Sequence, residues 1–214
     1  MLFLLMLIFC KIVALFTGVI LLKHLTLPYR LILIQVFIAL AIEVTGYYMS
    51  IGQVKNGWIF NLYLLPELWL FGLAGRYFYR KNYLLVNVPI MLLVGTACLI
   101  IDVYFNGINN LAHWAILSIG IILILIYLNA LIGNSLFTDN IFSQPIFWIS
   151  IATILYYACI IPSFGLYQYL ADSHPNILKK LYNIVFIFNN VRYIFIAVGF
   201  YLFAKQFKSG KLSA

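Results

Sequence analysis

The sequence predicts an all-α membrane protein in which seven transmembrane helices form a single polytopic bundle. Two observations lead to this prediction. First, 65% of the 214 residues are apolar and only 8% are charged, which leaves too few polar side chains to cover a soluble globule of this size. Second, the apolar residues fall into seven runs of about 20 residues, the length that a helix needs to cross ~30 Å of hydrocarbon.

Short connections separate the seven runs, so we expect one compact domain over residues 1–204, followed by a short basic tail over residues 205–214. The first run is interpreted as a membrane helix and not a secretory signal, because Lys11 interrupts it and no cleavage pattern precedes Lys23. The predicted spans are Leu2–Leu22, Leu31–Ser50, Trp58–Gly75, Tyr83–Ile101, Leu111–Leu131, Ile146–Leu166 and Leu181–Phe203.

Lysine and arginine are divided unequally between the two sets of connections, and cytoplasmic connections are the ones enriched in these residues. One set holds eight of them, Lys23, Arg30, Arg76, Arg80, Lys81, Lys205, Lys208 and Lys211, and the other holds Lys55, Lys179 and Lys180. We therefore expect the N-terminus outside and the C-terminus in the cytoplasm.

Four charged residues lie inside the predicted spans: Lys11, Glu43, Glu67 and Arg192. At a rise of 1.5 Å per residue, the first three lie about 11 to 15 Å from the outer ends of their spans and Arg192 lies about 17 Å from its own. A charge at membrane depth costs roughly 2.5 to 3.5 kcal/mol on insertion scales, so each needs a partner, a proton or a water-filled cavity. Because their formal charges sum to zero, the four can neutralise one another if they meet.

The functional interpretation of this group is a ligand or proton site in the outer half of the bundle, with Glu43 or Glu67 as acceptor and Lys11 or Arg192 as counter-ion. Asn189 joins the group because it lies three residues before Arg192 and shares its helix face. The alternative is a charge network that fixes helix packing and binds nothing.

Prolines mark three of the spans. Pro66 directly precedes Glu67, and it is expected to kink the third span and to leave a carbonyl free beside the carboxylate. Pro89 and Pro162 are predicted inside spans four and six, where they can kink the helices without any motion.

Several classes of protein are excluded. The formal charge of +8 is scattered at the ends of apolar runs and forms no basic tract for nucleic acid. The three cysteines and three histidines show no metal-ligand or haem spacing, so neither a metal nor a cofactor is expected. No protease motif is present, so no catalytic residue is assigned and an enzyme is not expected. Arg192 stands where a microbial-type rhodopsin carries its retinal lysine, which excludes that family.

Four stretches carry a resemblance to a family: LPYRLILIQVFIALAIEVTGYY, FNLYLLPELWLFGL, QPIFWISIATILYY and NILKKLYNIVFIFNNVRYIF. The chain resembles a poorly characterised group of bacterial seven-helix membrane proteins, which occur alone and as the membrane-embedded sensory half of histidine kinases. The resemblance implies acidic residues in spans two and three, which correspond to Glu43 and Glu67. Pro66 is a departure from the pattern.

The expected function is therefore that of a non-enzymatic signalling or sensory subunit of the bacterial inner membrane. Its partners are the lipid bilayer, a small-molecule or lipid ligand, and a membrane or cytoplasmic signalling protein. Two alternatives stay open, a small-solute or proton-coupled transporter and a structural subunit of a membrane complex.

Overall fold

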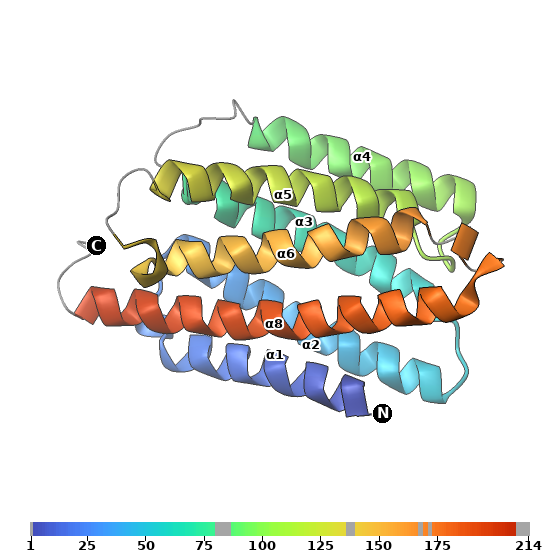
Figure 1. Cartoon of the computed structure of the whole chain (residues 1–214), viewed down its shortest axis with the longest axis horizontal. Coiled ribbons are helices and arrows are strands. Elements are labelled where there is room, and N and C mark those ends of the chain that lie inside the picture. The colour runs from blue at the N-terminus through green and yellow to red at the C-terminus, as the bar shows by residue number, and fades with distance from the viewer. Residues whose placement is uncertain (1, 80–86, 136–139, 167–168, 171–172, 209–214) are drawn as a thin grey trace.

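The computed structural model describes residues 2–79, 87–135, 140–166, 169–170 and 173–208, and within them it is all-helical. The helices run roughly side by side along the long axis of the molecule (Figure 1). They are α1 (Leu2–Ile20), α2 (Leu27–Ile51), α3 (Gly57–Tyr77), α4 (Val88–Asn106), α5 (His113–Ser135), α6 (Pro145–Gly165) and α8 (Pro175–Lys208), with short 3-10 turns at Leu22–His24 and Ile141–Ser143.

Six of these helices, α2 to α6 and α8, are long and apolar enough to cross a membrane. The described side chains of α1, from Met6 to Ile20, form a shorter apolar helix. Large apolar side chains cover the outer surface, as Phe16, Phe37 and Ile100 illustrate with exposed fractions of 66%, 60% and 64%. A surface of this kind is stable against lipid and unstable in water, so the chain is a multi-pass membrane protein.

Prolines in the first turn begin α2, α4 and α6, where the missing N–H has no helical partner to lose. Pro89 is one of them, so the prediction that it kinks the interior of the fourth span was wrong. The Asn87 side chain caps the same turn by accepting from the Ile90 N–H at 3.4 Å. Pro66 and Pro162 do lie inside their helices, and α3 and α6 continue through them.

Several predicted boundaries differ from the structure by four to six residues. Helix α2 begins at Leu27 and not at Leu31, α5 ends at Ser135 and not at Leu131, and α8 begins at Pro175 and not at Leu181.

The helix predicted to end at Ile101 continues to Asn106. In its last turn Asp102 accepts from the Ala115 N–H of α5, and the Asn106 carbonyl accepts from the Asn110 side chain. Its predicted start at Tyr83 lies outside the described residues. The tail predicted from residue 205 is helical as far as Lys208, which extends α8 beyond its apolar part.

The two ends of the bundle differ in chemistry. We call one the basic end, because its described residues include Lys23, Arg30, Arg76, Lys205 and Lys208. The other is the Asn-rich end, with Asn56, Asn106, Asn109 and Asn110. In Figure 1 the last turns of α8 lie at the basic end and the first turns of α1 at the Asn-rich end.

Six of the helices form a closed ring. Packing contacts join α1 to α2, α2 to α3, α3 to α5, α5 to α6, α6 to α8, and α8 back to α1. Helix α4 lies outside this ring, against α3 and α5. Its contact with α3 is close, because Gly72 faces Leu92 and Gly95 faces Leu68, and a Cβ at either glycine would lie within 2.7 Å of the facing leucine.

Aromatic rings fill the interior of the ring toward the basic end. There Tyr29 contacts Phe78 and Phe203, with ring centroids 5.3 and 4.1 Å apart, and Tyr127 contacts Phe71 and Phe78. The Tyr127 hydroxyl donates to the Phe71 carbonyl at 3.1 Å. These tilted and edge-on rings close the interior at this end. The charged residues lie in the interior nearer the Asn-rich end.

Candidate functional site

The four charged residues predicted inside the spans meet as two ion pairs between helices. Lys11 of α1 contacts Glu43 of α2, with 2.8 Å between Nζ and Oε2. Arg192 of α8 contacts Glu67 of α3, with 2.7 Å between Nη1 and Oε1. Lys11 is 2% exposed and Arg192 1% exposed. Each cation therefore has a counter-ion in a setting where an unpaired charge would be strongly unfavourable.

The Arg192–Glu67 pair crosses the interior of the ring, since none of the main packing contacts among the described residues joins α3 directly to α8. Aromatic rings surround the guanidinium, whose Cζ lies 4.4 Å from the centroid of Phe71, 4.5 Å from that of Tyr156 and 5.3 Å from that of Tyr157. These distances are in the range of cation–π contacts, which are strengthened when the cation is removed from water.

Tyr193 joins the two pairs into one cluster. The Lys11 Nζ lies 5.1 Å from the centre of its ring, and the Arg192 Cζ lies 5.9 Å from the same centre. Lys11 also approaches the Ala39 carbonyl of α2 at 3.5 Å. Residues from four helices thus hold both cations at one level of the bundle.

A cavity of about 300 Å³, here called the luminal cavity, lies in the ring on the Asn-rich side of this cluster. Four of the five residues predicted as a ligand site line it: Lys11, Glu43, Glu67 and Asn189. The fifth, Arg192, is paired to Glu67 and does not line it. On α3 the lining runs from Phe60 to Glu67, and it ends there, so the ion pairs mark the deep limit of the cavity.

Several buried polar atoms near this limit have no hydrogen-bond partner. They are Oδ1 of Asn189, the hydroxyl of Tyr157, and Nε and Nη2 of Arg192. The Tyr157 hydroxyl lies near the Glu67 carboxylate without meeting the geometry of a hydrogen bond. Because a buried polar group without a partner is unfavourable by about 1–3 kcal/mol, the atoms of Asn189 and Tyr157, whose side chains line the cavity, are suited to hold water or the polar group of a ligand.

Tyrosines form much of the lining, and the sequence reasoning did not assign them. Tyr63, Tyr156, Tyr157, Tyr182 and Tyr193 all face the luminal cavity. A signal was present for three of them. Tyr63 lies four residues before Glu67 and so shares its helix face. Tyr156 and Tyr157 lie in mid-span, away from the interface where tyrosine is usually found. Gln35 is a further buried polar residue, and it donates to the Tyr63 hydroxyl.

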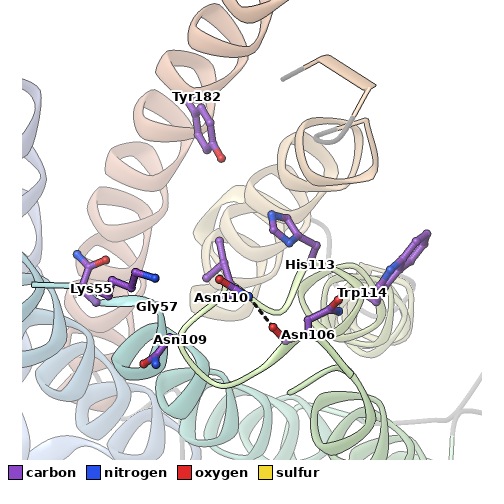
Figure 2. A pocket seen from close by; sticks show the side chains of 10 residues that line it. Lys55, Gly57, Asn106, Asn109, Asn110, His113, Trp114 and Tyr182 are labelled. Atoms are coloured by element: carbon purple, nitrogen blue, oxygen red, sulfur yellow. Dashed lines mark hydrogen bonds between the residues drawn. The ribbon is translucent and has the colours of Figure 1, made fainter. Parts of the chain in front are cut away.

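A second, more polar cavity of about 580 Å³ opens at the Asn-rich end, and we call it the vestibule (Figure 2). Leu111 and Tyr182 line both cavities, so the vestibule adjoins the luminal cavity. Figure 2 shows Lys55 and Tyr182 on one side of it and His113 and Trp114 on the other, around the α4–α5 connection. The Asn110 side chain donates to the Asn106 carbonyl at 2.6 Å within that connection.

Two polar side chains hold the α4–α5 connection in place. Asn61 of α3 donates to the carbonyls of Ile108 and Asn110 at 2.9 and 2.7 Å, and it accepts from the Ala112 N–H at 2.9 Å. Asp102 accepts from the Ala115 N–H at 2.9 Å, in the first turn of α5. Sequence reasoning missed Asp102 because the predicted fourth span ended one residue before it.

No family model, curated protein or solved structure matches this chain.

Proposed function

We propose that this chain is a non-enzymatic signalling or sensory subunit of the bacterial inner membrane that binds a small or lipidic ligand in the luminal cavity. The observation that supports this function is the position of the two buried ion pairs. Three of their four side chains, Lys11, Glu43 and Glu67, line the deep limit of a cavity, and Asn189 and Tyr157 in the same lining carry polar atoms that lack hydrogen-bond partners. A network that served packing alone would have its polar atoms satisfied.

The proposed arrangement in the membrane has seven spans, with α1 as the first. The basic end faces the cytoplasm and the Asn-rich end faces outside, following the distribution of lysine and arginine. The ligand then reaches the protein from the outer side of the membrane, and the basic end contacts a membrane or cytoplasmic signalling partner.

A cavity-filling variant tests the proposed function. Ala39 lines the luminal cavity, whereas Ala41 is exposed two residues later on the same helix. We expect Ala39→Phe to fill the cavity and Ala41→Phe to leave it open. The full chain is purified from cells, and mass spectrometry of its organic extract compares the small molecules retained by the two variants and the wild type.

The proposed function predicts a molecule that the wild type and Ala41→Phe retain in equal amounts. The amount retained by Ala39→Phe should be lower by about tenfold or more, which corresponds to a loss of about 1.4 kcal/mol of binding energy. Identical extracts from all three, with all three folded, would contradict the proposal and favour a structural subunit. Circular dichroism and thermal unfolding check that each variant is folded.

A proton-coupled or small-solute transporter is the second candidate, and one observation favours it. The Glu43 side chain is 17% exposed at the cavity although it is paired to Lys11, so it is accessible for proton exchange. In proteoliposomes a transporter gives proton flux, reported by an internal pH dye, that is lost in Glu43→Gln. A sensor gives no such flux in the wild type or in the variant.

A further inference from the structure

We propose that the ligand of the luminal cavity is a small uncharged molecule with an apolar body and one hydroxyl-type head, and that Asn189 and Tyr157 bind this head. This inference rests on the proposed function and defines the chemical class of the ligand. Three properties of the cavity lead to it: the balance of charges, the unpartnered polar atoms, and the apolar lining.

The charges that line the cavity are already neutralised. Lys11 is paired with Glu43, and Glu67 is paired with Arg192. Among the described residues that line the cavity, no further Lys, Arg, Asp or Glu is present. A carboxylate or ammonium ligand would therefore enter a low-dielectric space without a free counter-ion, or would have to displace one from an existing pair, which is strongly unfavourable. An uncharged ligand meets neither penalty.

The unpartnered atoms specify the head. Oδ1 of Asn189 is only an acceptor, so it requires a donor from the ligand. The Tyr157 hydroxyl both donates and accepts. A single hydroxyl complements the two, because it donates to Asn189 and accepts from Tyr157. An ether or ester group lacks the donor, and a hydrocarbon satisfies neither atom.

The remaining lining specifies the body. Apolar side chains come from every helix of the ring, as Leu7, Ile42, Phe60, Ile116, Ile160 and Phe186 show. A volume of about 300 Å³ lies at the lower limit for ligand sites, which range over ~300–1,000 Å³. The body is therefore a medium-length chain or a small ring, and a full membrane phospholipid does not fit.

Photolabelling with three probes of the same shape tests this class. The probes are a ten-carbon primary alcohol, the corresponding carboxylate and the corresponding amine, each with a diazirine in mid-chain. The full chain is placed in phosphatidylcholine nanodiscs at pH 7, where the acid is ionised and the amine is protonated. Each probe is used at the same bilayer concentration, and unlabelled 1-decanol is the competitor. Mass spectrometry locates the label.

We expect the alcohol to label the α8 segment 182–193 saturably. The carboxylate and the amine should label this segment at least about fivefold less than the alcohol does.

Asn189→Leu is expected to lower the alcohol labelling about fivefold, the effect of one lost hydrogen bond. Asn183→Leu is the matched control, since Asn183 lies on the same helix but is exposed and does not line the cavity. It should label like the wild type. Tyr157→Phe, which removes only a hydroxyl, is the second test of the head site.

Equal or stronger labelling by either charged probe would overturn the proposal, and so would alcohol labelling that neither Asn189→Leu nor Tyr157→Phe reduces. The absence of any saturable alcohol label would also overturn it. These outcomes are distinct from failure of the proposed function. If Ala39→Phe still loses a co-purified molecule, the cavity binds a ligand of another class; if it loses none, the sensory function itself fails.

Discussion

At the scale of single residues, the two ion pairs differ in how completely water is excluded. The Glu67 side chain is 4% exposed and its partner Arg192 1%, whereas Glu43 is 17% exposed beside Lys11. Removing one member of a buried pair leaves the other uncompensated, and the loss is largest where no water can replace the missing partner. The two glutamates therefore form a natural comparison.

We expect Glu67→Gln to lower the free energy of unfolding by about 3–5 kcal/mol, because it leaves the Arg192 guanidinium buried without a counter-ion. Glu43→Gln is expected to have a smaller effect, since water reaches that carboxylate. Unfolding in a mixed-micelle denaturant titration measures both. An equal effect of the two substitutions would show that the difference in burial is not the cause.

Replacing both members of the inner pair gives the control. The variant with Glu67→Gln and Arg192→Gln removes both charges, so we expect it to be more stable than Glu67→Gln alone. If the double variant is instead less stable than the single one, the arginine is stabilised by its aromatic surroundings without the carboxylate.

At the scale of helices, α3 connects the luminal cavity to the α4–α5 connection. Asn61 lies in its second turn and bonds three backbone groups of that connection, and Glu67 follows less than two turns later. The backbone of the connection lacks regular helical partners at these positions, so the Asn61 amide replaces them. The position of the vestibule therefore depends on Asn61, together with the Asp102 contact to the first turn of α5.

We expect Asn61→Leu to destabilise the protein by about 2–4 kcal/mol, the sum of three hydrogen bonds at roughly 1 kcal/mol each with one buried donor left unpaired. The loss should be local before it is global. Hydrogen exchange should become faster in residues 107–112 while α6 and α8 keep their protection. Uniform acceleration through all helices would contradict a local role.

Gly57 gives a second prediction at this scale, because a Cβ there would lie 2.2 Å from the Asn109 carbonyl oxygen. The backbone of the connection has to move to admit a methyl group, so Gly57→Ala is expected to destabilise by about 1–3 kcal/mol. Gly165→Ala is the matched control, since its nearest atom would be at 3.9 Å. Thermal unfolding of both variants measures the difference in stability. Equal shifts of the unfolding temperature would contradict the close contact between Gly57 and the Asn109 carbonyl.

The sequence predicted the helices and the charged residues, since both are expressed locally. Apolar runs of membrane length predict helices, and Glu67 and Arg192 are conspicuous because charge inside such a run is rare. The tyrosine lining was harder to predict, because Tyr156 and Tyr157 become significant only when α6 is known to face α8. Asp102 was missed for a similar reason: its partner, the Ala115 N–H, belongs to the next helix.

At the scale of the whole molecule, the ring of six helices with α4 outside it is the property that hydropathy does not encode. Any of the seven apolar helices has a composition suited to lie on the outside. The close fit of Gly72 and Gly95 to the facing leucines attaches α4 to α3, and the charged pairs join α1 to α2 and α3 to α8. The order of helices around the ring thus follows from specific side-chain contacts.

The proposed orientation makes a prediction at this scale. Gln53 at the Asn-rich end and Leu22 at the basic end are both exposed and uncharged, so cysteine at either position leaves the charge distribution intact. In intact cells a membrane-impermeant maleimide should label Gln53→Cys and should label Leu22→Cys only after permeabilisation. The unsubstituted chain gives the background from its own three cysteines. The reverse pattern would mean that the basic end is outside.

The measurement that tests the luminal site most directly is an experimental density map of the full chain in lipid nanodiscs, as purified from cells. The proposed function predicts density that is not protein inside the ring, beside Asn189 and Tyr157, with the Glu67 and Arg192 side chains in contact at its deep limit. A ring interior filled by side chains, or Glu67 and Arg192 in separate surroundings, would contradict it.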